Sequence, residues 1–317
     1  MSLAQTLLPY PAQAPTLTTH FTVASGGRIR TVEGPPNRQA SDGAHCSSRV
    51  VHQRLSLEIP TASLKPPAIS VYHMPVSEAL PVTEQLEIAG EGWLAAFSTA
   101  AQAPGTLDPA ALARPVQAWA SSRLGRAVPV LYADQRHTAL IFSYSAHGPL
   151  AAEAHCVGIC DGLLTAEPYV TLTVRTADCL PVVMACPGVA AILHCGWRSL
   201  AGDIIGKCVR RFAAEYGVVA ETLQAVIGVG IGPCHYGVGP EVVASLAALP
   251  AAAPSWIKDG RVDLAAWTKG RLMEVGLPAN HIRILPGCTA CSPHHHSFRR
   301  DGQRAGRQWT AVVLTAS

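Results

Sequence analysis

Residues 169–200 read YVTLTVRTADCLPVVMACPGVAAILHCGWRSL, in which three short apolar runs are separated by polar or glycine-containing turns. Runs of this length, rich in Val, Leu and Ile, are typical of buried strands. The sequence therefore predicts strands over Tyr169–Val174, Leu180–Ala185 and Val189–His194. A helix is predicted next, over Ser199–Tyr216, because its apolar residues recur at helical spacing. Together they indicate a helix packed on a sheet.

The alternation of apolar strands and amphipathic helices continues on both sides of this stretch. Asp108 and Pro109 supply an N-cap and a first-turn proline for a helix toward Leu124, which Pro115 should kink or delay. Further strands are predicted at Val128–Asp134, Thr138–Tyr144, Leu223–Val229, His281–Leu285 and Trp309–Leu314, and further helices at Glu241–Leu249 and Asp263–Val275. This pattern indicates a mixed domain of the α+β class over residues 91–317.

Residues 1–90 have a different composition from the rest of the chain. They hold 10 of the 25 prolines, with clusters at Gly34–Asn37 and Lys65–Pro67 that forbid long helices. We therefore expect an irregular N-terminal extension over residues 1–90, either poorly ordered or loosely docked on the domain.

Charge and cysteine content exclude several classes of protein. Only 14% of the 317 residues are charged and the formal net charge is +3, which does not favour binding to nucleic acid. Proline and glycine break the uncharged stretches Cys179–Trp197 and Thr222–Pro240, so we expect no membrane span. Met1–Thr19 lacks the features of a secretory signal, and we expect a cytoplasmic protein. Its ten cysteines are then better explained as thiols, metal ligands or a nucleophile than as disulfides.

One cysteine and two histidines stand at the edges of predicted strands. Cys179 lies at a strand start, His194 ends the next strand, and His137 opens an earlier one. A thiolate with two imidazoles can hold zinc and leave a fourth position open. The same side chains could serve as a cysteine nucleophile with a histidine base. They could also be two partnered histidines and a small buried thiol, and spacing alone leaves all three readings open.

Four motifs around these residues resemble those of a known family. RTADCLP at Arg175–Pro181 is similar to its [TA]-D-C-x-P strand, and HCGWRS at His194–Ser199 to its H-A-G-W-R-G. GIGPCHYGVGPEV at Gly230–Val242 and the Cys288–Gln308 segment, with CT, SFRRDG and GRQ, match its last two motifs in order. The chain is thereby identified as a member of the laccase-domain family, also called multicopper polyphenol oxidase-like proteins or peptidoglycan editing factors.

The resemblance implies a three-layer α/β/β sandwich with mixed sheets and a cleft that holds zinc on His137, Cys179 and His194. It implies purine nucleosides and phosphate as substrates, with phosphorolysis of adenosine, inosine, guanosine or methylthioadenosine and deamination of adenosine. The first histidine departs from the family pattern, since Gln135–Thr138 reads QRHT where members usually carry QVHG. The resemblance leaves the oligomeric state open.

Several further residues are candidates for contacts around this centre. Arg198, Arg299 and Arg300 could bind phosphate, because a guanidinium binds oxyanions with two parallel hydrogen bonds. Trp197 and Tyr236 could stack on a purine, and Asp178 and Gln135 could orient the ligands. Each also has a structural reading, as a helix cap, an ion-pair cluster, a packed aromatic or a turn cap.

Other functions stay open at the level of sequence. The alternatives are a metal-free cysteine amide hydrolase acting on peptidoglycan precursors, a copper-dependent phenol oxidase, and a binding module without activity. Copper oxidation is not favoured, because the domain offers one His-x-His pair, His294 with His296. A second metal site around Cys288, Cys291 and His294–His296 is also not favoured, because paired ligand spacing is lacking.

Overall fold

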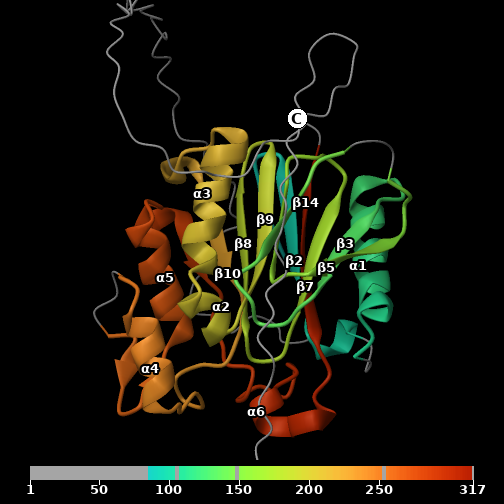
Figure 1. Ribbon diagram of the computed structural model, residues 1–317. Coiled ribbons are helices and arrows are strands. Elements are labelled where there is room, and N and C mark those ends of the chain that lie inside the picture. The colour runs from blue at the N-terminus through green and yellow to red at the C-terminus, as the bar shows by residue number, and fades with distance from the viewer. Residues whose placement is uncertain (1–84, 104–106, 147–149, 252–254, 316–317) are drawn as a thin grey trace, which may run out of the picture. The chain divides into compact units, whose positions relative to one another are not determined.

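The computed structural model describes residues 85–103, 107–146, 150–251 and 255–315, which form two large mixed sheets stacked face to face (Figure 1). The first sheet contains, in spatial order, β1 (Leu86–Gly90), β2 (Trp93–Phe97), β14 (Gln308–Leu314), β7 (Thr171–Thr176), β3 (Val130–Asp134) and β5 (Ala154–Ile159). The second contains β13 (Ile282–Ile284), β10 (Gln224–Ile227), β8 (Leu180–Cys186), β9 (Val189–Cys195), β6 (Gly162–Thr165) and β4 (Ile141–Tyr144). A small hairpin pairs β11 (Ile257–Lys258) with β12 (Arg261–Val262).

The helices cover the outer faces of the two sheets (Figure 1). The second sheet is covered by α2 (Trp197–Ala201), α3 (Ile204–Tyr216) and α5 (Leu264–Glu274), and α4 (Pro240–Ala247) packs against α2. The first sheet carries α1 (Pro109–Leu124), and α6 (Phe298–Asp301) lies in the segment before β14. The predicted α/β/β layers with mixed sheets are therefore confirmed, and α1 adds a further layer on the first sheet.

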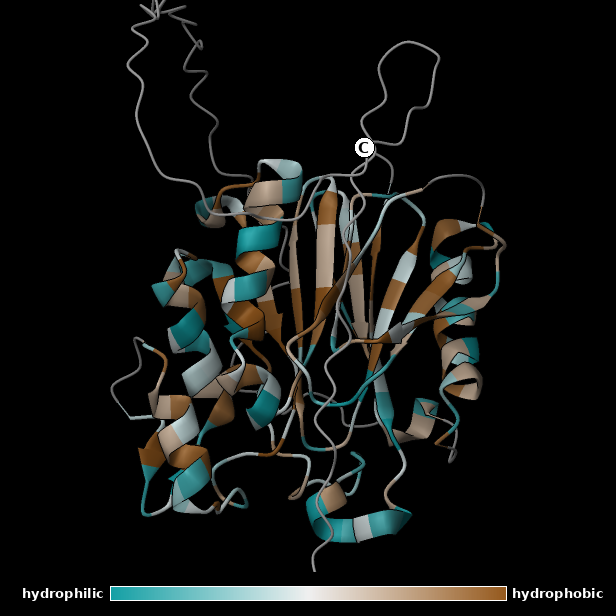
Figure 2. Cartoon of the chain, viewed as in Figure 1, coloured by the Kyte–Doolittle hydropathy of each residue, from teal (hydrophilic) through white to brown (hydrophobic). Residues whose placement is uncertain are grey.

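The period of two along each strand divides its side chains between two cores. Val183 of β8 packs between the sheets, whereas Val182 and Met184 pack under the helices. Figure 2 shows the result, with apolar residues concentrated in the strands and hydrophilic residues on the helices. Among the described residues, no helix combines the length and the apolar character that crossing a bilayer requires.

The predicted strands and helices occur, with some differences in their limits. Leu86–Gly90, which we placed in the N-terminal extension, forms β1 and pairs with β2, whereas residues 1–84 lie outside the described part of the chain. The predicted helix Ser199–Tyr216 is divided at Gly202 and Asp203 into α2 and α3. Asp203 adopts a left-handed conformation, with φ of 60°, and its side chain caps α3 at the amide of Gly206.

Candidate metal centre

Three side chains from the second sheet and from segments that lead into it converge on one point. Cys179 immediately precedes β8, and His194 lies near the end of the antiparallel strand β9, opposite Pro181. His137 lies between β3 and β4, four residues before β4 begins, so it does not open a strand as predicted. The ligand atoms of the three residues all lie within 4.8 Å of one another. The structure thus brings together the three residues that we predicted as ligands.

The distances suit a tetrahedral cation with one sulfur and two nitrogen ligands. Cys179 Sγ lies 3.7 Å from His137 Nε2, and the two imidazole rings meet edge to face with centroids 4.9 Å apart. Around zinc, a sulfur at about 2.3 Å and a nitrogen at about 2.0 Å lie roughly 3.5 Å apart. Three protein ligands would leave one position open for a water molecule or a substrate. The residues present therefore fit a zinc-type ion.

Asp161 holds both histidines, although sequence reasoning did not single it out. This fully buried carboxylate accepts hydrogen bonds from His194 Nδ1 at 2.7 Å and from the His137 amide at 3.0 Å. It also accepts bonds from the amide and the hydroxyl of Thr138, which helps to keep His137 at a φ of 57°. Burial would raise the pKa of Asp161, but the bonds from His194 and Thr138 lower it below its usual value. In the sequence, the sign of this role is that Asp161 is a single carboxylate within a run of apolar residues.

The charges of Cys179 and His194 stabilise each other. Burial would raise the pKa of the Cys179 thiol, but the charge of His194 and the hydrogen bond with His137 lower it to about 6. Burial would lower the pKa of His194, but the Cys179 charge and the bond to Asp161 raise it to about 9. Without a cation, these opposite shifts favour a thiolate beside an imidazolium over two neutral side chains. The thiolate is the form that binds metals and attacks carbonyl groups.

The three ligands form part of the wall of a pocket of about 650 Å³. Five arginines also line it: Arg136, Arg175, Arg198, Arg299 and Arg307. Four of them are engaged, because Arg136 pairs with Asp134 and the other three donate to backbone carbonyls. Within the described part of the chain, the guanidinium of Arg198 has no hydrogen bond or ion pair, and it lies 4.4 Å from the Trp197 ring centroid. Arg198 is therefore the cation most available to an anionic ligand.

Of the aromatic and amide candidates, Tyr236 and Gln135 line the pocket and Trp197 does not. Tyr236 lines the pocket under Arg299, whose guanidinium lies 5.4 Å from its ring centroid. Gln135 also lines it, and its side-chain amide exchanges hydrogen bonds with the backbone of Arg175. Trp197 is not among the lining residues and packs partly buried against the core of the second sheet. Of the two aromatic candidates from the sequence, Tyr236 is thus the one that a bound base could reach, and Phe298 also lines the pocket.

Arg300 and Asp178 have structural partners in the C-terminal loops. Arg300 lies outside the lining, where it pairs with Asp301 and donates to the carbonyls of Thr289, Ser292 and His295. Asp178 does line the pocket, and its carboxylate accepts bonds from the Thr289 hydroxyl and the Arg299 amide, both at 2.6 Å. These bonds join the segment before β8 to the loop before α6 and to α6 itself. Asp161 is the carboxylate that contacts a candidate ligand histidine.

We expect Asp161→Asn to weaken zinc binding by about 10- to 100-fold, because a carboxylate behind a ligand histidine sets its orientation and basicity. A competitive titration against a chromophoric chelator measures this change. The control is Asp259→Asn, an exposed aspartate whose φ of 52° asparagine also tolerates, and it should keep the parent affinity. An unchanged affinity in Asp161→Asn would show that the carboxylate does not support the centre.

Comparison with known proteins adds a family and several named relatives. A sequence model of the family described as multi-copper polyphenol oxidoreductase laccase matches residues 105–315. Purine nucleoside phosphorylase YlmD of Geobacillus stearothermophilus is 35% identical over 156 residues, 46% of this chain and 57% of that protein. Adenosine deaminase RL5, from an unknown prokaryotic organism, is 32% identical over 50% of this chain and 64% of that protein. The matches thus span about three fifths of the length of these relatives.

Two solved structures share the fold over most of their length. The hypothetical protein YfiH of Bacillus licheniformis superposes with a TM-score of 0.64 at 25% identity, covering 75% of this chain and 98% of that one. YlmD from Geobacillus stearothermophilus superposes with a TM-score of 0.63 at 26% identity, covering 74% and 94%.

Proposed function

Because this chain belongs to the multi-copper polyphenol oxidoreductase laccase family, as its four motifs predicted, we propose that its Cys179 centre acts on purine nucleosides. The proposed reactions are phosphorolysis of adenosine, inosine, guanosine or methylthioadenosine and deamination of adenosine, with zinc as the metal. The names of the relatives, which include purine nucleoside phosphorylases and an adenosine deaminase, support an enzyme of this kind.

The observation that carries the proposal is that one pocket holds both a group of candidate metal ligands and an unpaired cation. His137, Cys179 and His194 supply a three-ligand centre, and Arg198 supplies an unpaired cation on the same wall. A divalent cation held by the three ligands would act as a Lewis acid toward an oxygen nucleophile. Arg198 would bind phosphate with two parallel hydrogen bonds.

Both reactions need an oxygen nucleophile delivered to a bound purine nucleoside. In phosphorolysis a phosphate oxygen forms a bond to C1′ of the ribose, and the bond from C1′ to the purine breaks with its electron pair leaving on the base. In deamination, water adds to C6 of adenine and ammonia leaves. Tyr236 offers a ring against which the base can stack, and burial raises the pKa of its phenol to about 12, so the ring stays neutral.

Zinc fits the Cys179 centre better than the several coppers that the family's description names. A multi-copper oxidase holds its ions largely through histidines, whereas this centre offers two histidines and a thiolate. One thiolate with two imidazoles is instead a three-ligand set of the kind that catalytic zinc sites use.

The phosphate role of Arg198 predicts a division between the two reactions. We expect Arg198→Ala to raise the KM for phosphate about 10- to 100-fold, because a hydrogen-bonded charge contact of about 1.5–3 kcal/mol is lost. Deamination of adenosine uses no phosphate and should change less than about threefold. Chromatography of the products from adenosine and inosine, with and without phosphate, measures both rates.

Arg114→Ala, an exposed arginine on α1 outside the pocket, is the matched control and should leave both rates unchanged. Equal losses in the two reactions would remove Arg198 from the phosphate site. Absence of free base and of inosine from the folded, zinc-loaded parent protein would contradict the proposed function as a whole.

The thiolate and imidazolium of the metal-free pair favour one second candidate, a cysteine amide hydrolase. In that reaction Cys179 Sγ bonds to the carbonyl carbon, and His194 donates its proton to the departing amine nitrogen as the carbon–nitrogen bond breaks. Water then hydrolyses the thioester and restores the thiolate. The two candidates differ in their need for metal, so removal of metal by a chelator separates them.

A further inference from the structure

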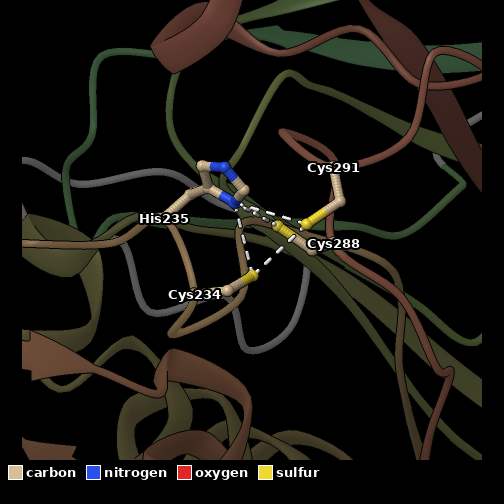
Figure 3. A group of neighbouring side chains, drawn as sticks. All are labelled: Cys234, His235, Cys288 and Cys291. Atoms are coloured by element: carbon tan, nitrogen blue, oxygen red, sulfur yellow. Dashed lines mark hydrogen bonds between the residues drawn. The ribbon is translucent and has the colours of Figure 1, made fainter.

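A second group of Cys and His side chains lies outside the Cys179 centre. Cys234 and His235 come from the turn between β10 and α4, and Cys288 and Cys291 come from the loop between β13 and α6. Their ligand atoms all lie within 4.8 Å of one another, and the three cysteines are free thiols. Figure 3 shows the His235 ring directing one nitrogen at the three sulfur atoms.

The separations match the edges of a tetrahedron around one ion. His235 Nδ1 lies 3.3 Å from the sulfurs of both Cys234 and Cys291 and 3.9 Å from that of Cys288, and the Cys234 and Cys291 sulfurs are 3.4 Å apart. With zinc–sulfur bonds of about 2.3 Å and a zinc–nitrogen bond of about 2.0 Å, the sulfur–sulfur edge of a tetrahedron would be roughly 3.8 Å and the sulfur–nitrogen edge roughly 3.5 Å. Three sulfurs and one nitrogen therefore already stand near the positions that zinc requires.

The surrounding backbone favours the thiolate form of Cys288. The Gly232 amide donates to Cys288 Sγ at 3.1 Å, a bond typical of a charged sulfur. A side chain at Gly232 would start 3.1 Å from the Cys288 Cβ, so glycine lets the two loops approach. Arg261 donates to the Cys234 carbonyl and Arg299 to the His235 carbonyl, which places two cations beside the group.

The two loops of this group also build the wall of the nucleoside pocket. Tyr236 follows His235 directly, and Arg299 donates to the carbonyls of His235 and Gly237. Thr289 lies between the two cysteines of the second loop, where its amide donates to the Gly230 carbonyl and its hydroxyl donates to Asp178. A tie between these loops would therefore position Tyr236 and Arg299 without contact with the reacting atoms.

We propose that Cys234, His235, Cys288 and Cys291 form a second zinc site, closed by four protein ligands, that fastens the β10–α4 turn to the β13–α6 loop. Four protein ligands fill the tetrahedron and leave no position for water, which is the pattern of structural zinc sites. This site does not depend on the proposed nucleoside reaction. It also differs from the second site considered in the sequence, around Cys288, Cys291 and His294–His296. Cys234 and His235 take the place of the three histidines.

The test counts metal in the full chain, purified under reducing conditions, by mass spectrometry of the elements. We expect about two zinc ions per chain in the parent protein, one for each donor group. The double variant Cys234→Ser/Cys291→Ser should lose about one of them, Cys179→Ala should lose the other, and Cys156→Ser, an exposed thiol outside both groups, should lose neither. An unchanged zinc count in the double variant would overturn the proposal.

A measurement on the parent protein avoids reliance on the folding of the variants. With zinc bound, iodoacetamide should modify Cys234 and Cys291 at least about tenfold more slowly than Cys156, and a chelator should remove that protection. Peptide mapping by mass spectrometry gives the rate for each cysteine. Equal rates before and after chelation would overturn the site.

Discussion

Cys179→Ala is expected to lower kcat/KM for the proposed nucleoside phosphorolysis and deamination by at least about a thousandfold, the largest of the expected effects. The substitution removes the one anionic ligand of the three and leaves two histidines, which hold a divalent cation weakly. Loss of the cation removes several kcal/mol of charge stabilisation in the transition state, and each 1.4 kcal/mol corresponds to a factor of about ten in rate. Product chromatography with adenosine and inosine measures the loss.

The metal content of the same variant separates loss of the centre from loss of the fold. Cys179→Ala should retain the zinc of the Cys234 group and the circular dichroism spectrum of the parent, because Cys179 takes no part in that group. Turnover within a few-fold of the parent would contradict a catalytic role for the centre. For the alternative amide hydrolase, activity would survive chelation and disappear on alkylation of Cys179, whereas the zinc enzyme would lose activity on chelation and regain it with added zinc.

Gly196→Ala is expected to have the second-largest effect, although the change adds a single methyl group. A Cβ at this position would lie 2.8 Å from Cδ2 of His137 and 3.0 Å from Sγ of Cys179, closer than carbon and sulfur atoms pack. The two ligands would have to move apart, and we expect zinc affinity to fall by at least about 100-fold, with turnover falling in parallel. Competitive zinc titration and the nucleoside assay measure the two losses.

The backbone at Gly196 should accept alanine, which makes this substitution specific for the ligands. Its φ of −81° is ordinary for any residue, so global stability should change little. Gly125→Ala is a control with the opposite properties. Its backbone is unfavourable for alanine, with φ of 65°, but no atom lies within 4 Å of an added Cβ. It should cost about 1 kcal/mol of folding free energy and leave zinc binding and turnover intact. Parent-like affinity in Gly196→Ala would show that the His137 ring has room to move.

The central strands and the long helices were predictable because each carries its own periodic pattern. Leu180–Ala185 and Val189–His194 became β8 and β9 with one residue added at each carboxyl end. In contrast, β5 and β6 were not predicted. β5 is a sheet edge with much of its length exposed, and β6 has only four residues, so neither shows a clear alternation. Weak local patterns of this kind become strands only through pairing with neighbours.

Short motifs were enough to name Cys179 and His194, because each stands within a recognisable pattern, and His137 was named although its QRHT segment departs from the family's QVHG. The carboxylate beside His194 was less accessible to sequence reasoning. Asp178 adjoins Cys179 in the chain and was the natural candidate, yet its bonds go to Thr289 and Arg299, while Asp161 reaches His194 from 33 residues away. Such a contact depends on which strands pair, and β6 pairs with β9.

Periodicity and local motifs therefore determined the class of fold, the family and the three candidate ligands of the Cys179 centre, since all of these depend on residues near one another in the chain. Tertiary folding decided which side chains join them. Cys234 and Cys291 are 57 residues apart, and their sulfurs meet at 3.4 Å because β10 and β13 run parallel and side by side, so that the loops after the two strands emerge at one end of the sheet. The spacing of residues in the sequence does not predict this contact, because the distance between the two loops is set by strand pairing and packing.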